Sequence, residues 1–192
     1  MDMSEPIKTD KSYLRVGDFS DRELLEQCKL EIVGLLNVRP EITVFGRKCH
    51  QHRNVGFFSD DSVGYKYSNQ LSKSKPLTPS LKLLLELVNN EFKGNFNGIL
   101  VNEYMDGKDT IGAHSDNENG LGTAGVIGIS IGATRKFRIK NKKTKEKTDI
   151  LMTDGMILQM GGDFQKEFTH EIPREAKVKE SRVSFTFRYH LE

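Results

Sequence analysis

From residue 96 onward, the chain is a series of short strand-like stretches separated by turns that carry Gly or Asp. The stretches cover residues 97–104, 110–115, 126–131, 137–140, 150–152, 156–160 and 182–189. A series of this kind, following two helical patterns, predicts two packed sheets with helices on one face. We therefore expect an α+β fold that is mainly β: a double-stranded β-helix, or jelly roll, with the N-terminal helices packed on one sheet.

Two amphipathic helices are predicted ahead of these strands. The first begins in a capping box at residues 20–23 and should end by Asn37. Thr78 caps the second helix, with Pro79 at its first position. We expect residues 1–17 to form a loosely ordered lead-in and residues 69–77 to form a polar loop.

Three residues in the second half of the chain carry metal-binding chemistry. His114 and Asp116 are two positions apart, so a strand directs both side chains to one face. His170 could add a third ligand from another strand. Two imidazoles and one carboxylate leave coordination positions open, which suits a non-haem Fe(II) oxygenase. The alternative is a chance His-x-Asp among five histidines, each held by structural hydrogen bonds.

The segment 182–188 has a strict two-residue alternation. Arg182 and Arg188 share one strand face with Ser184 and Thr186, while the remaining face carries apolar side chains that can pack into a core: Val183, Phe185 and Phe187. A pair of guanidinium groups on an inward polar face could hold a compact dicarboxylate. A solvated strand face is the alternative reading.

The charge of the chain is unevenly distributed. The formal net charge is only +2, but residues 135–147 hold eight basic residues and one acidic residue. A second basic cluster lies at residues 47–53. Either cluster could contact phosphates, and the alternative for residues 140–147 is a solvated hairpin tip.

Composition indicates a soluble globular protein. Charged residues make up 29% of the 192 positions and hydrophobic residues 36%, and no apolar run approaches the length of a membrane span. The N-terminus lacks the pattern of a signal peptide. Cys28 and Cys49 form neither a zinc pattern nor a disulfide framework. These features predict a cytoplasmic or nuclear protein with no membrane contact.

Several motifs follow one another in a distinctive order. They are Asn102-x-Tyr104, Asp106-Gly107, His114-x-Asp116-x-Glu118, Ser130-x-Gly132-Ala133-x-Arg135-x-Phe137, His170 and Arg182-x5-Arg188. This order resembles the AlkB family of iron- and 2-oxoglutarate-dependent nucleic-acid dealkylases. The resemblance covers roughly residues 42–189. It implies one domain over residues 1–192, with a substrate-recognition region at 42–95 and a jelly-roll catalytic core at 96–190.

The resemblance also implies a set of site residues. The Fe(II) ligands would be His114, Asp116 and His170. The residues around 2-oxoglutarate would be Asn102, Tyr104, Arg182, Ser184, Thr186 and Arg188. The substrate residues would be Tyr65 and Tyr67 lining the base pocket, Glu118 at its mouth, Arg53, and Phe45, which resembles the apolar finger of double-strand-acting relatives. For Phe45 the alternative is a core position in an ordinary strand, for the two tyrosines it is core or hairpin packing, and for Glu118 it is a plain turn residue within 117–120.

The activity implied is oxidative removal of N-methyl groups, of the 1-methyladenine and 3-methylcytosine type, from DNA or RNA. Fe(II) would be the cofactor, 2-oxoglutarate and O2 the cosubstrates, and the protein would act as a monomer. Two alternatives stay open: a 2-oxoglutarate oxygenase that acts on a protein or small molecule, and a non-catalytic jelly-roll binding module. A zinc hydrolase lacks its usual glutamate motif in this sequence.

Overall fold

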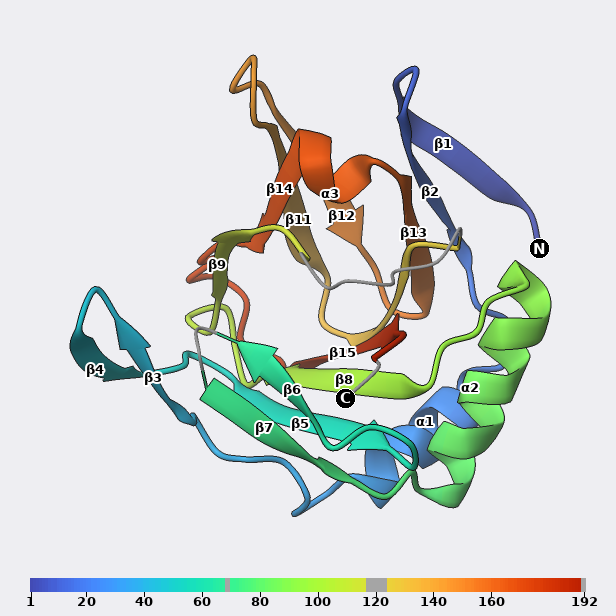
Figure 1. Ribbon diagram of the computed structural model, residues 1–192, viewed down its shortest axis with the longest axis vertical. Helices are drawn as coiled ribbons and strands as arrows, with labels where there is room; N and C mark the ends of the chain where they lie inside the picture. The colour runs from blue at the N-terminus through green and yellow to red at the C-terminus, as the bar shows by residue number, and fades with distance from the viewer. Residues whose placement is uncertain (68–69, 117–123, 191–192) are drawn as a thin grey trace.

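Two stacked β-sheets form the body of the protein (Figure 1). The computed structural model describes residues 1–67, 70–116 and 124–190. The four-stranded minor sheet has the order β12 (Lys147–Met152), β11 (Arg135–Asn141), β14 (Phe168–Ile172), β9 (Ile111–His114). A separate two-stranded hairpin consists of β3 (Glu41–Val44) and β4 (Arg47–His50).

The nine-stranded major sheet carries the N-terminal strands on one edge and the β6–β7 hairpin on the other. Its order is β1 (Met3–Lys8), β2 (Ser12–Asp18), β13 (Met156–Gly162), β10 (Val126–Gly132), β15 (Arg182–Arg188), β8 (Gly98–Tyr104), β5 (Asn54–Ser59), β7 (Gln70–Lys75), β6 (Gly64–Tyr67). The β5–β7 pair is parallel, and the other pairs are antiparallel. The mainly β jelly roll predicted from the sequence is therefore confirmed.

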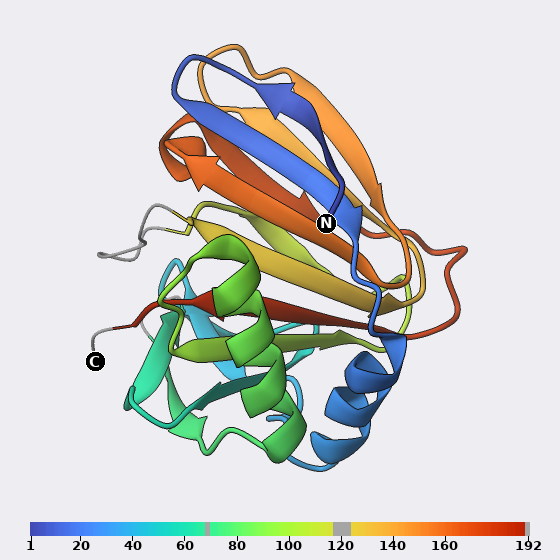
Figure 2. The same ribbon diagram turned by 90° about the vertical axis from the view of Figure 1, so that its right-hand side faces the viewer.

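Two helices, α1 (Arg22–Glu31) and α2 (Pro79–Phe92), cover one face of the major sheet (Figure 2). Their buried leucines pack in one apolar cluster with the odd-numbered side chains of β15, which are Val183, Phe185 and Phe187. The even-numbered side chains of β15 point to the other face, toward the minor sheet. The predicted alternation thus assigns one face of this strand to the core and the other to a polar interior.

Three local expectations need correction, and a fourth is confirmed. Residues 1–17 are not a loose lead-in, because β2 pairs with β13 along its length and Leu14 is fully buried. Residues 69–77 are not a loop throughout, since β7 runs from Gln70 to Lys75. The first helix is capped by Asp21 and not by Ser20 of the predicted capping box, because the Asp21 carboxylate accepts the backbone N–H of Leu24; its end at Glu31 agrees with the expected end by Asn37. The cap at Thr78 is confirmed, because its hydroxyl accepts the N–H of Leu81.

A second apolar cluster lies between the two sheets and holds the site in place. It includes Leu14 of β2, Tyr104 of β8, Phe137 of β11 and Phe164 of α3 (Phe164–Glu167). None of the helices in the described part of the chain has the length and apolar character that a membrane crossing requires.

Candidate active site

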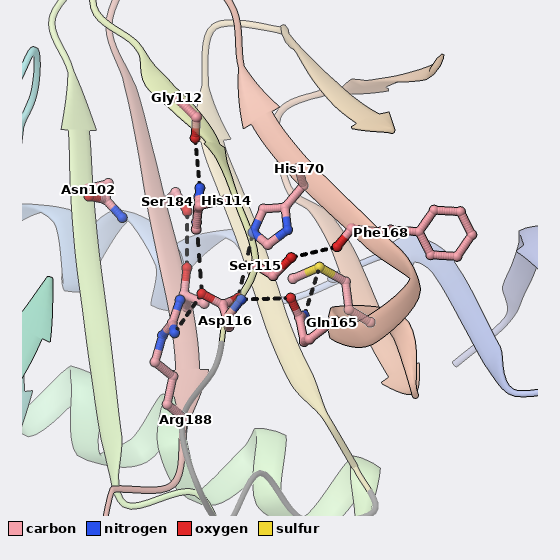
Figure 3. A network of polar contacts seen from close by, with 12 residues as sticks. Asn102, Gly112, His114, Ser115, Asp116, Gln165, Phe168, His170, Ser184 and Arg188 are labelled. Atoms are coloured by element: carbon pink, nitrogen blue, oxygen red, sulfur yellow. Dashed lines mark hydrogen bonds and ion pairs between the residues drawn. The ribbon is translucent and has the colours of Figure 1, made fainter. Parts of the chain in front are cut away.

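Three potential metal ligands converge between the two sheets (Figure 3). His114 ends β9 and lies directly opposite His170 of β14 in the antiparallel register, and Asp116 follows two residues later. One ligand atom from each residue lies within 4.8 Å of the others. Asp116 Oδ1 is 3.8 Å from His114 Nε2, and Asp116 Oδ2 is 3.6 Å from His170 Nε2. The structure brings the predicted triad together.

Short contacts to the backbone fix the orientation of this triad (Figure 3). His114 Nδ1 lies 2.8 Å from the carbonyl oxygen of Gly112, so Nδ1 donates and Nε2 keeps a lone pair for a metal. The Ser115 hydroxyl donates to the Phe168 carbonyl at 2.7 Å. The backbone N–H of Asp116 donates to Gln165 Oε1 at 2.8 Å. Sequence reasoning missed Gln165, because a one-turn helix leaves no periodic signal.

The electrostatics keep the ligands in the protonation states that a metal requires. Burial lowers the pKa of His114 and lowers that of His170 to about 3, so both imidazoles are neutral near pH 7. Burial opposes ionisation of Asp116, but the guanidinium of Arg188 and the two imidazoles outweigh it and lower the pKa of Asp116 to about 2. The triad therefore presents two neutral nitrogens and one carboxylate.

This donor set fits Fe(II). Asp116 Oδ1 accepts a charge-assisted hydrogen bond from Arg188 Nη1 at 2.9 Å. Asp116 Oδ2 is buried and has no hydrogen-bond partner among the residues that the structure describes. A buried carboxylate oxygen without a donor is unfavourable, and a metal between the two histidines would satisfy it. Two imidazoles and one carboxylate on one face leave positions open for a chelating cosubstrate.

Arg182 and Tyr104 form a second polar group in the same cavity. They face each other in the β15–β8 register, and the Arg182 guanidinium lies 5.4 Å from the centre of the Tyr104 ring. Arg182 Nε donates to Ser130 Oγ at 2.7 Å. Arg182 Nη1 is buried without a partner in the described ranges. Ser130 binds one side of the guanidinium, and Nη1 on the other side remains available to a carboxylate. This role of Ser130 was not predicted from the sequence.

The other predicted cosubstrate residues line this cavity, whose volume is about 280 Å³. Asn102 Oδ1 accepts a hydrogen bond from Arg53 Nε at 2.9 Å. The hydroxyls of Ser184 and Thr186 lie 3.5 Å apart on the inward face of β15. The strand parity of residues 182–188 is confirmed, and the solvated-face alternative is wrong because both arginines are buried.

An aromatic and basic wall borders the triad on the side of β6. The Arg53 guanidinium lies 5.0 Å from the centre of the Tyr67 ring, and that ring meets the ring of His114 edge to face at 6.1 Å. Tyr65 lies beneath Arg188 at 4.9 Å and also packs against Phe57 at 5.7 Å. Tyr65 and Tyr67 both line the cavity. Tyr65 is also buried in an apolar cluster, so it has both the packing role and the lining role that the sequence offered as alternatives.

The remaining predicted substrate residues have different outcomes. Phe45 is fully exposed at the turn of the β3–β4 hairpin, with φ of 50°, so the core alternative is wrong. Glu118 lies outside the described residues. Arg135 is buried and donates to the carbonyls of Asp106, Asp109 and Pro173, so it does not belong to a surface patch. The basic tip of the β11–β12 hairpin is therefore smaller than the sequence predicted.

Comparisons with known proteins agree with this geometry. The sequence pattern of the 2OG-Fe(II) oxygenase superfamily matches residues 16–188. The fold and the site thus define an iron- and 2-oxoglutarate-dependent dioxygenase, and the chain belongs to this superfamily. Its cofactor is Fe(II), and its cosubstrates are 2-oxoglutarate and O2.

The relatives place the chain in the AlkB-like branch. It is 27% identical to the DNA oxidative demethylase ALKBH2 of Bos taurus over 194 residues, which cover 96% of this chain and 69% of the relative. For ALKBH2 of Homo sapiens the identity is 28%, covering 93% and 72%. For the alpha-ketoglutarate-dependent dioxygenase alkB homolog 3 of Rattus norvegicus it is 34%, covering 65% and 46%.

The solved structure of OsALKBH1 has the same fold. It superposes with a TM-score of 0.58 at 15% identity, and the match covers 97% of this chain and all of that one. At this identity the likeness concerns the fold alone.

Proposed function

We propose that this protein oxidatively removes N-methyl groups from alkylated bases in DNA or RNA, of the 1-methyladenine and 3-methylcytosine type. One observation carries the proposal: a single cavity joins the His114, Asp116 and His170 triad, a buried arginine pair and an aromatic wall that includes Tyr65 and Tyr67. The similar proteins named DNA oxidative demethylase support the substrate class.

The residues around the triad would bind and orient the reactants. Arg182 and Tyr104 would hold the distal carboxylate of 2-oxoglutarate, and Arg188 and Asn102 would bind near its other end. When bound, Fe(II) with 2-oxoglutarate and O2 supplies the oxidation of the N-methyl group to N-hydroxymethyl, with release of succinate and carbon dioxide. The hydroxymethyl group then leaves as formaldehyde. The protein's part in the reaction is orientation and exclusion of water.

The target base must leave the stack to enter a cavity between two sheets. Tyr67 would stack against the base opposite His114, and Glu118 would accept a hydrogen bond from its exocyclic amine. Phe45 would fill the gap that the base leaves, because an apolar wedge has to be exposed in the free protein. Phe45 is fully exposed in the turn between β3 and β4, which supports this role, and Figure 1 shows this hairpin projecting from the body of the protein.

The test is direct. The Fe(II)-loaded protein is incubated with 2-oxoglutarate and short oligonucleotides that carry 1-methyladenine or 3-methylcytosine, as DNA and as RNA, and the products are weighed by mass spectrometry. We expect each demethylated product to be lighter by about 14 mass units, because a methyl group is replaced by a hydrogen atom, a difference of one CH₂ unit. His114→Ala should abolish 2-oxoglutarate turnover without changing the circular dichroism spectrum.

The possible results distinguish a nucleic-acid demethylase from a 2-oxoglutarate oxygenase with another substrate and from a protein without this activity. Unchanged oligonucleotides of all four kinds, with 2-oxoglutarate still consumed, would overturn the demethylase and favour an oxygenase that acts on a protein or small molecule. Normal turnover by the His114→Ala variant would overturn the assignment of the metal site. A jelly-roll binding module would consume no 2-oxoglutarate at all.

We also propose that the protein works as a monomer in the cytoplasm or nucleus. In the described chain, strands of both sheets contribute to the cavity lining, among them β5, β8 and β15 of the major sheet and β9, β11 and β14 of the minor sheet. Light scattering during gel filtration tests the monomer, and a mass of twice 21.8 kDa would contradict it.

A further inference from the structure

The side chain of Gln51 is a buried polar group that the roles assigned above do not use. Gln51 follows β4, and its backbone N–H donates to the Pro40 carbonyl at 2.8 Å. The residue is 6% exposed, and it lines the same cavity as the metal triad. Its amide oxygen Oε1 is buried and has no hydrogen-bond partner in the part of the chain that the structure describes.

An unpartnered amide oxygen in this position is unfavourable in the free protein. Leaving a buried acceptor unsatisfied costs the desolvation of that group, and native proteins rarely keep such groups without a reason. An apolar side chain of the same length would fill the space without this cost. A ligand that brings an N–H group to Oε1 would remove it.

The position of Gln51 identifies which ligand would do so. Gln51 and Arg53 are both buried on the cavity side of one segment, while His52 between them is exposed. Arg53 lies over Tyr67, and Tyr67 meets the ring of His114. Gln51 therefore belongs to the wall along which a base would lie when its methyl group faces the triad.

We propose that the Gln51 amide reads the edge of the flipped base and favours 1-methyladenine over 3-methylcytosine; this rests on the function proposed above. With N1-methyl directed at the triad, the adenine edge that remains free presents the N6 amine and the N7 acceptor. A glutamine amide pairs with this edge through two hydrogen bonds: Oε1 accepts the N6 hydrogen on the N7 side, which leaves the other N6 hydrogen to Glu118, and Nε2 donates to N7.

Cytosine cannot make the same pair. With N3-methyl directed at the triad, its free edge presents the N4 amine followed by a C5–H group. Oε1 can still accept from N4, but the Nε2 donor meets no acceptor. The difference between the two bases is one hydrogen bond at Gln51, and it depends on the N7 atom of adenine.

The experiment compares the ratio of kcat/KM for 1-methyladenine to that for 3-methylcytosine, in otherwise identical single-stranded DNA. Gln51→Met keeps the length of the side chain and removes both hydrogen-bonding groups. We expect it to lower the ratio about tenfold, the effect of one hydrogen bond to a base edge. Gln27→Met is the matched control, because Gln27 is exposed on α1, and it should leave the ratio unchanged.

A modified base tests the contact without relying on turnover by the variant alone. Replacing 1-methyladenine by 1-methyl-7-deazaadenine removes the N7 acceptor. The native protein should bind this oligonucleotide about tenfold more weakly, by fluorescence anisotropy, and Gln51→Met should bind both oligonucleotides equally. The anisotropy measurement uses protein loaded with Mn(II) and 2-oxoglutarate in the absence of O2.

The possible results distinguish a failure of the role of Gln51 from a failure of the proposed demethylase function. Demethylation of both bases with an unchanged ratio in Gln51→Met would overturn the role of Gln51 and leave the proposed function standing. An equal loss on both bases, or equal sensitivity of native protein and variant to 7-deaza substitution, would also overturn it. Failure of the native protein to demethylate either base would overturn the function itself.

Discussion

Asp116 shows how single residues in this site serve two partners. One carboxylate oxygen accepts from Arg188 at 2.9 Å, and the other is free of donors in the described structure and faces His170. Arg188 therefore orients the carboxylate and keeps it ionised, while the second oxygen remains available to a metal. The same arginine lies over the ring of Tyr65, so it joins the metal site to the aromatic wall of the cavity.

Arg182 should determine the affinity for 2-oxoglutarate. Its guanidinium is buried, and Nη1 has no partner within the described ranges, so a carboxylate of the cosubstrate would complete its hydrogen bonding. Charge-assisted hydrogen bonds contribute about 1.5–3 kcal/mol each, and 1.4 kcal/mol is about a factor of ten. We expect Arg182→Ala to raise the half-saturating concentration of 2-oxoglutarate at least about tenfold.

Steady-state kinetics with varied 2-oxoglutarate would measure this change. Arg174→Ala, at an exposed position outside the cavity, is the control and should leave the value unchanged. An unchanged half-saturating concentration in Arg182→Ala would remove Arg182 from this role.

His170 should make the stability of the metal-free protein depend on pH. Burial lowers its pKa in the folded state to about 3, whereas the unfolded chain titrates near the ordinary value of 6.5. Between these values the unfolded state binds the extra proton, so the stability is fully present above pH 6.5 and falls as the pH drops. The loss amounts to about 1.4 kcal/mol per pH unit for one proton.

Urea denaturation of the metal-free protein at pH 7.0 and at pH 5.0 would measure this slope. His170→Gln keeps a polar side chain and removes the titration, so its free energy of unfolding should fall less between the two pH values. The same fall in the variant and in the native protein would show that His170 does not carry the effect.

At the scale of strands and helices, the sequence identifies elements that have a repeating apolar pattern. In β15 the two-residue alternation predicts which side chains enter the core and which line the cavity, and the structure agrees. In α2 the cap at Thr78 and the apolar stripe predict the helix correctly. His114 and Asp116 could be paired from their spacing alone.

Other elements depend on contacts between distant residues, which leave no local signal. β1 and β2 become regular because β2 pairs with β13, about 140 residues later, and backbone pairing of this kind is set by register rather than composition. β7 is polar in sequence, and its place in the sheet comes from parallel pairing with β5. The contacts of Gln165 and Ser130 with site residues likewise arise only when distant segments meet.

The β3–β4 hairpin should decide whether duplexes are accepted as substrates. Phe45 lies fully exposed at its tip, where it adds nothing to the apolar core. If Phe45 fills the gap left by a flipped base, Phe45→Ala should lower the activity on duplex DNA, because unstacking costs a few kcal/mol that the wedge offsets. The activity on single strands and the melting temperature should stay the same.

Demethylation assays on matched single-stranded and duplex substrates would measure this selectivity. Val33→Ala removes an exposed apolar side chain just after α1 and serves as the control. Equal losses on single-stranded and duplex DNA in Phe45→Ala would contradict a wedge.

At the scale of the whole molecule, the N-terminal hairpin connects the edge of the major sheet to the element that holds Asp116. The hydroxyls of Thr9 and Ser12, in and beside the β1–β2 turn, donate to Glu167 Oε1 at 2.7 and 2.5 Å. Glu167 ends the short helix α3, which also carries Gln165. The first strands of the chain are therefore part of the framework behind the site.

Leu14 tests whether this N-terminal segment is integral to the fold. It is fully buried in the cluster between the two sheets, beside Tyr104 and Phe137. Replacing a fully buried leucine by alanine removes apolar contacts and leaves a cavity, at a cost of about 2–5 kcal/mol. Leu14→Ala should lower the free energy of unfolding by that amount in urea denaturation. Leu30→Ala, the same substitution at an exposed position of α1, should change it by less than about 0.5 kcal/mol. If both variants were equally stable, the first strands would be a loosely attached lead-in after all, and the support they give to α3 and Asp116 would have to come from elsewhere.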